Sequence, residues 1–263
     1  MVDKLKIALI QIELTEGDPP RNTEKALKFM DKATQQGADL IILPELWSVG
    51  FAPMELDSLA ETPNGPSVNI MRDWTRDKGC YLLAGSIPEI AKKGVYNKSY
   101  LFGPKGQVLG EYSKIHLFDL MGEKSTFLEG SKPMVADVKG WRIGVMLCYD
   151  LRFPELARYY ATRGVHLIAI PALWPDARIG HWDTLLKARA IENQIYIAGA
   201  NAVGNMTDLY FPGQSMIIDP YGNSINQPEN RETLIIREIK QSEIAYVRED
   251  VAYINDIRSD IFG

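Results

Sequence analysis

The amino-acid sequence predicts an α/β protein whose two similar halves stack as a four-layer α-β-β-α sandwich. Short apolar runs, typical of buried strands, alternate with longer segments of helical periodicity. The order strand, helix, strand, helix, strand, followed by a two-strand unit, occurs twice. The strands near the start of each half are apolar throughout, as expected when helices cover one face of a sheet and a second sheet covers the other. We expect a single domain over residues 1–263.

In the first half, glycines mark the ends of the expected helices. Gly37 and Gly79 follow the two helical segments, and glycine often ends a helix because it accepts a left-handed conformation. The residues GPKG at 103–106 predict the turn of a two-strand unit, whose second strand is 108–112. The other expected elements are strand 6–14, helix 22–36, strand 39–43, helix 67–78 and strand 80–87.

The second half repeats this order. Pro154 suits the first turn of a helix, Gly164 suits its end, and DPYG at 219–222 predicts the turn of another two-strand unit. Residues 247–263 form a C-terminal tail of weak periodicity that we expect to pack on a neighbouring subunit. The other expected elements are strand 142–147, helix 154–163, strand 165–170, helix 181–193 and strand 195–201.

Composition excludes several classes of partner. A net charge of −5 and a pI near 5.4 argue against nucleic acid or an anionic membrane as the main partner. No apolar stretch approaches the roughly 20 residues that span a bilayer. The chain runs from Met1 almost directly into a strand pattern, so we see no signal peptide and expect a cytoplasmic protein. Its two cysteines, Cys80 and Cys148, should then be reduced thiols, with Cys80 in the core.

Cys148 lies between the apolar run 143–147 and the helix expected to start at Pro154. It therefore occupies a strand-to-helix connection, and ligands of α/β sheets bind at the carboxyl ends of strands. The alternative is that Cys148 is only a small buried apolar residue.

Two charged residues also follow expected strands. Glu45 comes after the strand 39–43 between apolar neighbours, so partial desolvation would suit it to general-base work. Lys114 follows the strand 108–112 and is flanked by Ile115 and Leu117. Each could instead be an ordinary surface residue. Together with the thiol they supply a nucleophile, a base and a cation for a developing oxyanion.

These segments resemble the nitrilase superfamily of carbon–nitrogen hydrolases, which uses a Glu–Lys–Cys set. Glu45 stands in LPELW, Lys114 in SKIHLF and Cys148 in LCYDLRFPE, and the resemblance runs from KIALIQ to RSDIF. Members that hydrolyse nitriles typically follow the cysteine with Trp-Glu, and carbamoyl hydrolases with Asn-Asp. The Tyr149-Asp150 found here is similar to the ω-amidase branch, as are PELWSVGF and HWDTLLKARAIENQ.

The resemblance implies a mechanism and a homodimer or higher homo-oligomer. Glu45 would accept the Cys148 proton, while the Lys114 ammonium and the backbone N–H of Tyr149 would stabilise the oxyanion. The family pattern also has a second glutamate after the lysine. We assign this role to Glu123, with Glu129, which directly precedes Gly130, as the alternative.

The substrate would be a small amide that carries a carboxylate. Arg152 and Arg178 are the expected carboxylate clamps, because guanidinium groups bind carboxylates with two hydrogen bonds. Phe51 and Trp174 are the expected apolar walls. Arg152 could instead form a buried ion pair that supports the cysteine loop, and residues 174–178 could be a surface turn.

The histidines offer weaker alternatives. His116, His166 and His181 lack metal-ligand spacing, so we predict no metal site. No dinucleotide-binding or P-loop glycine pattern occurs, so we predict no cofactor. A Cys–His hydrolase with His116 or His181 as the base stays conceivable, although Cys148 lacks the glycines of a nucleophile elbow.

The sequence therefore predicts an amidase that hydrolyses the terminal amide of a compound such as a 2-oxo acid monoamide, through a cysteine thioester. An N-carbamoyl amide hydrolase, or a catalytically weak binding or scaffold module of the same fold, is the alternative.

Overall fold

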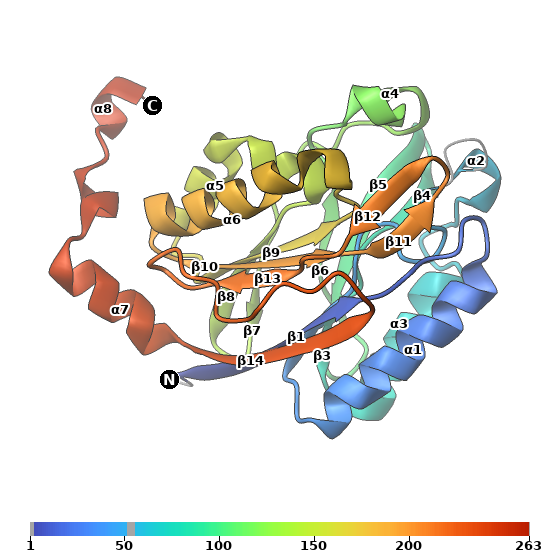
Figure 1. Ribbon diagram of the computed structural model, residues 1–263, viewed down its shortest axis with the longest axis horizontal. Coiled ribbons are helices and arrows are strands. Elements are labelled where there is room, and N and C mark those ends of the chain that lie inside the picture. The colour runs from blue at the N-terminus through green and yellow to red at the C-terminus, as the bar shows by residue number, and fades with distance from the viewer. Residues whose placement is uncertain (1–2, 52–55, 263) are drawn as a thin grey trace.

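The computed structural model describes residues 3–51 and 56–262 and contains two sheets packed face to face between layers of helices (Figure 1). The strands of the first sheet are β1 (Lys4–Gln11), β2 (Leu40–Ile42), β3 (Tyr81–Leu83), β4 (Ile87–Ala91), β5 (Gly94–Phe102), β6 (Val108–Ser113) and β14 (Thr233–Lys240). Their order is β14-β1-β2-β3-β5-β4, and β6 also pairs with β5. The strands β1, β2 and β3 run parallel, so their carboxyl ends meet at one edge.

The second sheet has the order β13-β10-β9-β8-β7, with β8, β9 and β10 parallel. Its strands are β7 (Val135–Val138), β8 (Trp141–Val145), β9 (Leu167–Ala172), β10 (Tyr196–Asn201) and β13 (Met216–Ile218). A separate hairpin is formed by β11 (Val203–Met206) and β12 (Leu209–Pro212).

Two pairs of helices cover the outer faces of the sheets. The helices α1 (Pro19–Gln35) and α3 (Pro66–Lys78) lie on the first sheet, and α5 (Pro154–Ala161) and α6 (Ile179–Asn193) on the second (Figure 1). The predicted α-β-β-α sandwich is thus confirmed. The remaining helices are α2 (Leu56–Leu59), α4 (Glu123–Thr126), α7 (Gln241–Asp250) and α8 (Ser259–Phe262), with the 3₁₀ turns η1 (Asp119–Met121), η2 (Cys148–Arg152), η3 (Asp176–Arg178) and η4 (Tyr253–Asp256).

The apolar strands are explained by burial on both faces. Side chains alternate along a strand, so Leu5, Ile7 and Leu9 of β1 pack between the sheets, while Ala8 and Ile10 pack in the core that contains the α1 and α3 side chains. Every strand that is sandwiched in this way must be apolar on both sides, which accounts for the uninterrupted runs.

The structure corrects two expected elements. The expected strand 80–87 divides into β3 and β4 at Gly85, which has a φ of +49°. A Cβ atom there would lie 1.9 Å from the Pro44 carbonyl oxygen, so only glycine fits beside the segment that carries Glu45. The turn at 219–222 is present, but its second strand is reduced to a bridge between Ile218 and Ser224. The next strand, β14, pairs with β1 in the first sheet, where it satisfies the open edge of that strand.

The C-terminal tail leads away from the sandwich (Figure 1). Helix α7 buries Ile244 and Val247 against the body, whereas Tyr246, Val251 and Ile261 are exposed. In the described part of the chain, no helix is both long enough and apolar enough to cross a bilayer.

Candidate active site

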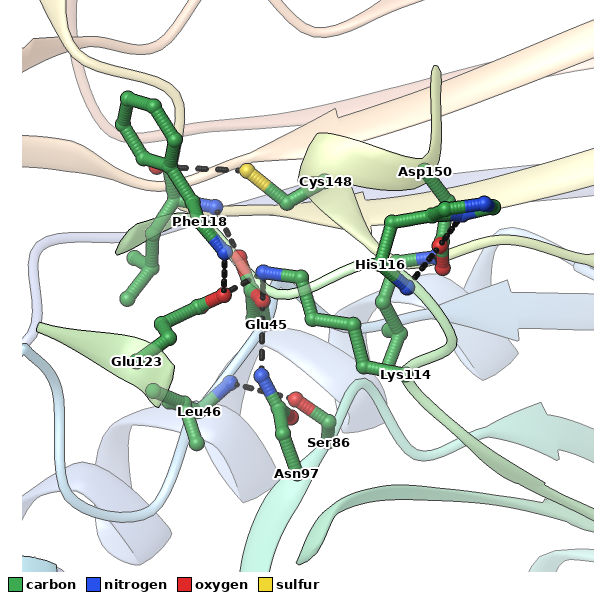
Figure 2. A network of polar contacts seen from close by, with 12 residues as sticks. Glu45, Leu46, Ser86, Asn97, Lys114, His116, Phe118, Glu123, Cys148 and Asp150 are labelled. Atoms are coloured by element: carbon green, nitrogen blue, oxygen red, sulfur yellow. Dashed lines mark hydrogen bonds and ion pairs between the residues drawn. The ribbon is translucent and has the colours of Figure 1, made fainter. Parts of the chain in front are cut away.

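Glu45, Lys114 and Cys148 converge between the two sheets, although they come from three separate strand ends (Figure 2). Glu45 follows β2, Lys114 follows β6 and Cys148 follows β8 across the interface. All three are buried, with relative exposures of 2%, 1% and 8%. The possibility that Glu45 and Lys114 are ordinary surface residues is therefore wrong.

Lys114 is held between two carboxylates. Its Nζ lies 2.8 Å from Glu45 Oε1 and 2.5 Å from Glu123 Oε1. Burial by itself lowers the pKa of the Lys114 ammonium, but Glu123, Glu45 and Cys148 together raise that pKa well above its usual value. The neighbouring carboxylates thus favour the ammonium form of Lys114, which is the form required of an oxyanion partner.

Glu123, and not Glu129, is the glutamate at Lys114. It begins α4, and its Oε2 accepts a hydrogen bond of 2.7 Å from the Phe118 N–H. Burial raises the pKa of the Glu123 carboxyl, and Lys114 opposes that shift. Glu129 is exposed and lines a different cavity. The structure therefore resolves the choice of which glutamate pairs with Lys114.

Glu45 is oriented by two further hydrogen bonds. The Asn97 side-chain Nδ2 donates to Glu45 Oε1 at 2.8 Å, and the Leu173 N–H donates to Oε2 at 2.9 Å. Asn97 lies within β5, and Leu173 directly follows β9. Sequence reasoning missed both residues. A buried asparagine in a strand was a readable signal, whereas the Leu173 contribution comes from its backbone.

Cys148 adopts a left-handed backbone conformation with a φ of +41°, which is uncommon outside glycine and is found at strained functional positions. Its Sγ contacts the Leu173 carbonyl oxygen at 3.5 Å. Burial, and next the charge of Glu45, raise the pKa of the Cys148 thiol well above its usual value, and Lys114 opposes this shift. This shift disfavours the thiolate, so a base that removes the thiol proton would assist nucleophilic attack.

A buried carboxylate anchors the cysteine turn. Asp150 Oδ2 accepts hydrogen bonds from the Tyr112 hydroxyl at 2.7 Å and from the Leu147 N–H at 2.9 Å. Its Oδ1 accepts one from the His116 N–H at 2.9 Å and contacts His116 Nδ1 at 2.8 Å (Figure 2). These contacts fix Cys148 relative to the Lys114 segment, and they occupy His116 with Asp150. The sequence did not identify Asp150 as an anchor.

Two adjoining cavities lead to the thiol, and they share Phe51, Phe118 and Met121 in their walls. The predicted wall Phe51 is thus present, and Phe118 is an additional one. The inner cavity is lined by Glu45, Leu46, Phe51, Lys114, Phe118, Met121, Glu123, Cys148 and Leu173. The outer cavity is lined by Phe51, Phe118, Leu120, Met121, Gly122, Pro175, Ala177, Arg178 and Leu209.

Of the two predicted clamp residues, Arg178 lines the outer cavity and Arg152 lines neither cavity. The Arg178 guanidinium lies 5.7 Å from the Phe118 ring centre. The Arg152 guanidinium lies 4.7 Å from the Trp174 ring centre, and its Nη1 is 3.2 Å from His181 Nδ1. Among the described residues, no carboxylate forms an ion pair with Arg152, so the proposed buried ion pair is absent.

Trp174 is buried, which contradicts a surface turn at the start of the segment 174–178. It does not line either cavity, and it contacts the site through Arg152. Tyr149 directly follows Cys148, so its backbone N–H is adjacent to the thiol residue in the chain. Its ring stacks on that of Phe118, with 4.7 Å between the ring centres. In the part of the chain that the structure describes, no group of three or more metal-ligating side chains gathers.

Comparisons with known proteins identify the family of the chain. A family model described as carbon-nitrogen hydrolase matches residues 6–249. The chain is 36% identical over 259 residues to the 2-oxoglutaramate amidase of Bacillus subtilis (strain 168), which covers 98% of this chain and 100% of that protein. It is 32% identical over 269 residues to the omega-amidase NIT2-A of Xenopus laevis, covering 99% and 97%.

A solved structure also matches over nearly the full length. It is a CN-hydrolase superfamily protein from Xanthomonas campestris with an arsenic adduct in the active site. The TM-score is 0.92 at 32% identity, and the match covers 97% of this chain and 98% of that one.

Proposed function

This chain belongs to the carbon–nitrogen hydrolase family, as its three motifs predicted, and we propose that it hydrolyses the terminal amide of a small carboxylated compound of the 2-oxo acid monoamide type. The products are the acid and ammonia. The observation that carries this proposal is the buried Glu45–Lys114–Glu123 ion network in the same cavity as the Cys148 thiol. A scaffold module has no need for three charged groups that are costly to bury.

Acylation begins at the thiol. Glu45 removes the Cys148 proton, and the sulfur attacks the amide carbonyl carbon to form a C–S bond. Negative charge then collects on the carbonyl oxygen. The Lys114 ammonium and the Tyr149 N–H stabilise it, and each donor of this kind contributes about a hundredfold or more in rate.

Glu45 also serves as acid and base in the remaining steps. Acylation ends when the tetrahedral intermediate collapses: Glu45 returns its proton to the nitrogen, the C–N bond breaks, and ammonia leaves a thioester on Cys148. Deacylation follows. Glu45 next takes a proton from water, whose oxygen attacks the thioester. The C–S bond breaks, and the thiol recovers the proton as the acid departs. No oxidant, reductant or cofactor is needed.

Substrate selection depends on the two arginines that are assigned to the carboxylate. Arg178 lines the outer cavity and Arg152 lies near Trp174, so we assign both to the substrate carboxylate. The similarity to a 2-oxoglutaramate amidase supports a substrate with a carboxylate at one end and an amide at the other. The apolar walls Phe51 and Phe118 suit the short carbon chain between them.

We also propose that the chain acts as one catalytic domain in a cytoplasmic homodimer or higher homo-oligomer. The apolar residues of the tail 247–263 support this, because Val251 and Ile261 are more than half exposed. Gly263 lies outside the described residues. The partner surface that covers the tail would bury these side chains.

The proposal is tested by ammonia release from a panel of compounds. The panel pairs 2-oxo acid monoamides with their neutral analogues and includes N-carbamoyl compounds and nitriles. Preferred turnover of the carboxylated amides is expected. Faster turnover of a carbamoyl compound would support that alternative, and no turnover of any compound would leave only the scaffold.

A further inference from the structure

Asn97 joins the segments that carry the base and the lysine. Its side-chain Nδ2 donates to Glu45 Oε1 at 2.8 Å, and its backbone oxygen accepts the Lys114 N–H at 2.9 Å. The side chain is fully buried, and Figure 2 shows it pointing at the Glu45 carboxylate. Asn97 does not line the inner cavity, so it acts on Glu45 and not on the substrate.

The two oxygens of Glu45 are occupied unequally. Oε1 receives two donors, Asn97 Nδ2 and Lys114 Nζ, which fill its two lone pairs. Among the residues that the structure describes, only the Leu173 N–H donates to Oε2, which leaves that oxygen a lone pair. The carbonyl oxygen of the same Leu173 contacts Cys148 Sγ, so the Leu173 backbone contacts both Oε2 and the thiol.

We propose that Asn97 is a positioning residue that occupies Oε1 and thereby makes Oε2 the atom that accepts the Cys148 proton. This inference rests on the proposed function, since it assigns an atom to the base of that reaction. Without Asn97, Oε1 regains a lone pair, and the carboxylate can turn so that its basic oxygen no longer points at the thiol.

The other end of the same side chain argues against a purely structural role. Asn97 Oδ1 has no hydrogen-bond partner among the described residues. A buried acceptor without a partner costs folding free energy, so an apolar residue of the same shape would suit stability better. The asparagine is explained by what its Nδ2 does for Glu45.

The test compares Asn97→Leu, which has a similar shape but no donor, with Asn97→Asp, which places a second carboxylate at Oε1. For Asn97→Leu we expect kcat to fall by about ten- to a hundredfold, as for loss of a hydrogen bond to a charged group, with KM unchanged. The acid limb of the pH–rate profile should move to higher pH, because loss of the Asn97 hydrogen bond favours the protonated form of the Glu45 carboxyl. Asn97→Asp should move it further.

Ser99→Ala is the matched control. Ser99 lies two residues along β5 on the same face, is fully buried, and its Oγ has no partner among the described residues. It should keep the wild-type kcat and pH profile. The inference is overturned if Asn97→Leu matches Ser99→Ala, or if KM rises while kcat and the acid limb stay unchanged.

If Asn97→Leu does not fold, Asn97→Asp decides alone: a shifted acid limb supports the inference and an unshifted one overturns it. The Cys148→Ala variant separates this inference from the proposed function. An active Cys148→Ala variant, or a wild type that releases no ammonia, overturns the proposed function and the inference with it. An inactive Cys148→Ala beside a normal Asn97→Leu overturns only the role of Asn97.

Discussion

Glu45 and Cys148 follow strands of different sheets, and the backbone of one residue contacts both: the Leu173 N–H donates to Glu45 Oε2 at 2.9 Å, while the Leu173 carbonyl oxygen contacts Cys148 Sγ at 3.5 Å. Leu173 directly follows β9, which lies beside β8 in the second sheet. The base from the first sheet is therefore aligned to the thiol by the backbone of the second. Leu173 contributes only backbone atoms to these two contacts.

Cys148→Ala should abolish ammonia release and leave the protein folded. Among the described residues, Cys148 is the only one lining the inner cavity that carries a thiol or hydroxyl, and its loss from this turn should cost roughly 1 kcal/mol of stability. Ammonia release and thermal unfolding are measured on the same sample. Activity retained by a pure, folded variant would contradict the mechanism.

Glu45→Gln should separate catalysis from thiol ionisation. After burial, the charge of Glu45 is the largest contribution that raises the Cys148 pKa, while Lys114 lowers it. Removing the Glu45 charge should therefore lower the thiol pKa, so that thiolate forms at lower pH than in the wild type. Amide hydrolysis should nevertheless be lost, because the base is gone. Thiolate absorbance followed against pH, beside ammonia release, checks both; a thiol pKa that rises would contradict this account.

Glu123→Gln should lower kcat by about ten- to a hundredfold, as expected for a charged hydrogen bond that is removed. The single oxygen acceptor of glutamine can keep the contact with Lys114 Nζ or with the Phe118 N–H, but not both. Glu129→Gln is the matched control, because Glu129 is exposed and should be dispensable. If the two variants exchange these phenotypes, Glu129 is the functional glutamate.

Arg178→Ala should reduce kcat/KM for a carboxylated amide by about ten- to a hundredfold and change the neutral analogue little. Arg178→Lys keeps the charge but loses the planar fork, so its loss should be smaller. Arg152→Ala is measured in parallel, with a folding check, since its guanidinium also packs on Trp174. A wild type without preference for the carboxylated compound would exclude both clamps.

Removing residues 252–263 should shift the protein toward monomer. This truncation keeps α7 and also Val251, whose carbonyl accepts a hydrogen bond of 2.7 Å from Gln194 Nε2. It removes Tyr253 and Ile261, which are exposed in the isolated chain. Sedimentation gives the mass and thermal unfolding gives the control. An unchanged oligomer would show that this part of the tail is not an interface.

The sequence was sufficient to predict the candidate site residues that come directly after expected strands. Glu45, Lys114 and Cys148 each follow a strand that the sequence predicted, and ligands of α/β sheets bind at the carboxyl ends of strands, so a shared site could be predicted. Asn97 could not be placed in this way. It lies inside β5, and its contact with Glu45 depends on how that strand is positioned in the sheet, which local sequence does not specify.

Long-range pairing also limited the prediction of the fold. Residues 233–240 come after all the strands expected for the second half, yet β14 pairs with β1 in the first sheet. Nothing in the local residues identifies the sheet that a strand joins. Likewise, Trp174 follows a strand and could have been a pocket wall, but its burial beneath Arg152 depends on packing between distant segments.

The pairing of β14 with β1 has a consequence for synthesis of the chain. Lys4 lies opposite Lys240, so β1, the first strand to leave the ribosome, stays unpaired on this side until β14, the last strand of the chain, has been synthesised. Until then, one edge of the first sheet offers unpaired backbone groups, which favour association with other chains. Pairing across such a sequence separation is slow, because loop closure must precede it. A nascent chain that stops before residue 233 should therefore be a client of chaperones, and release from them should coincide with the arrival of β14.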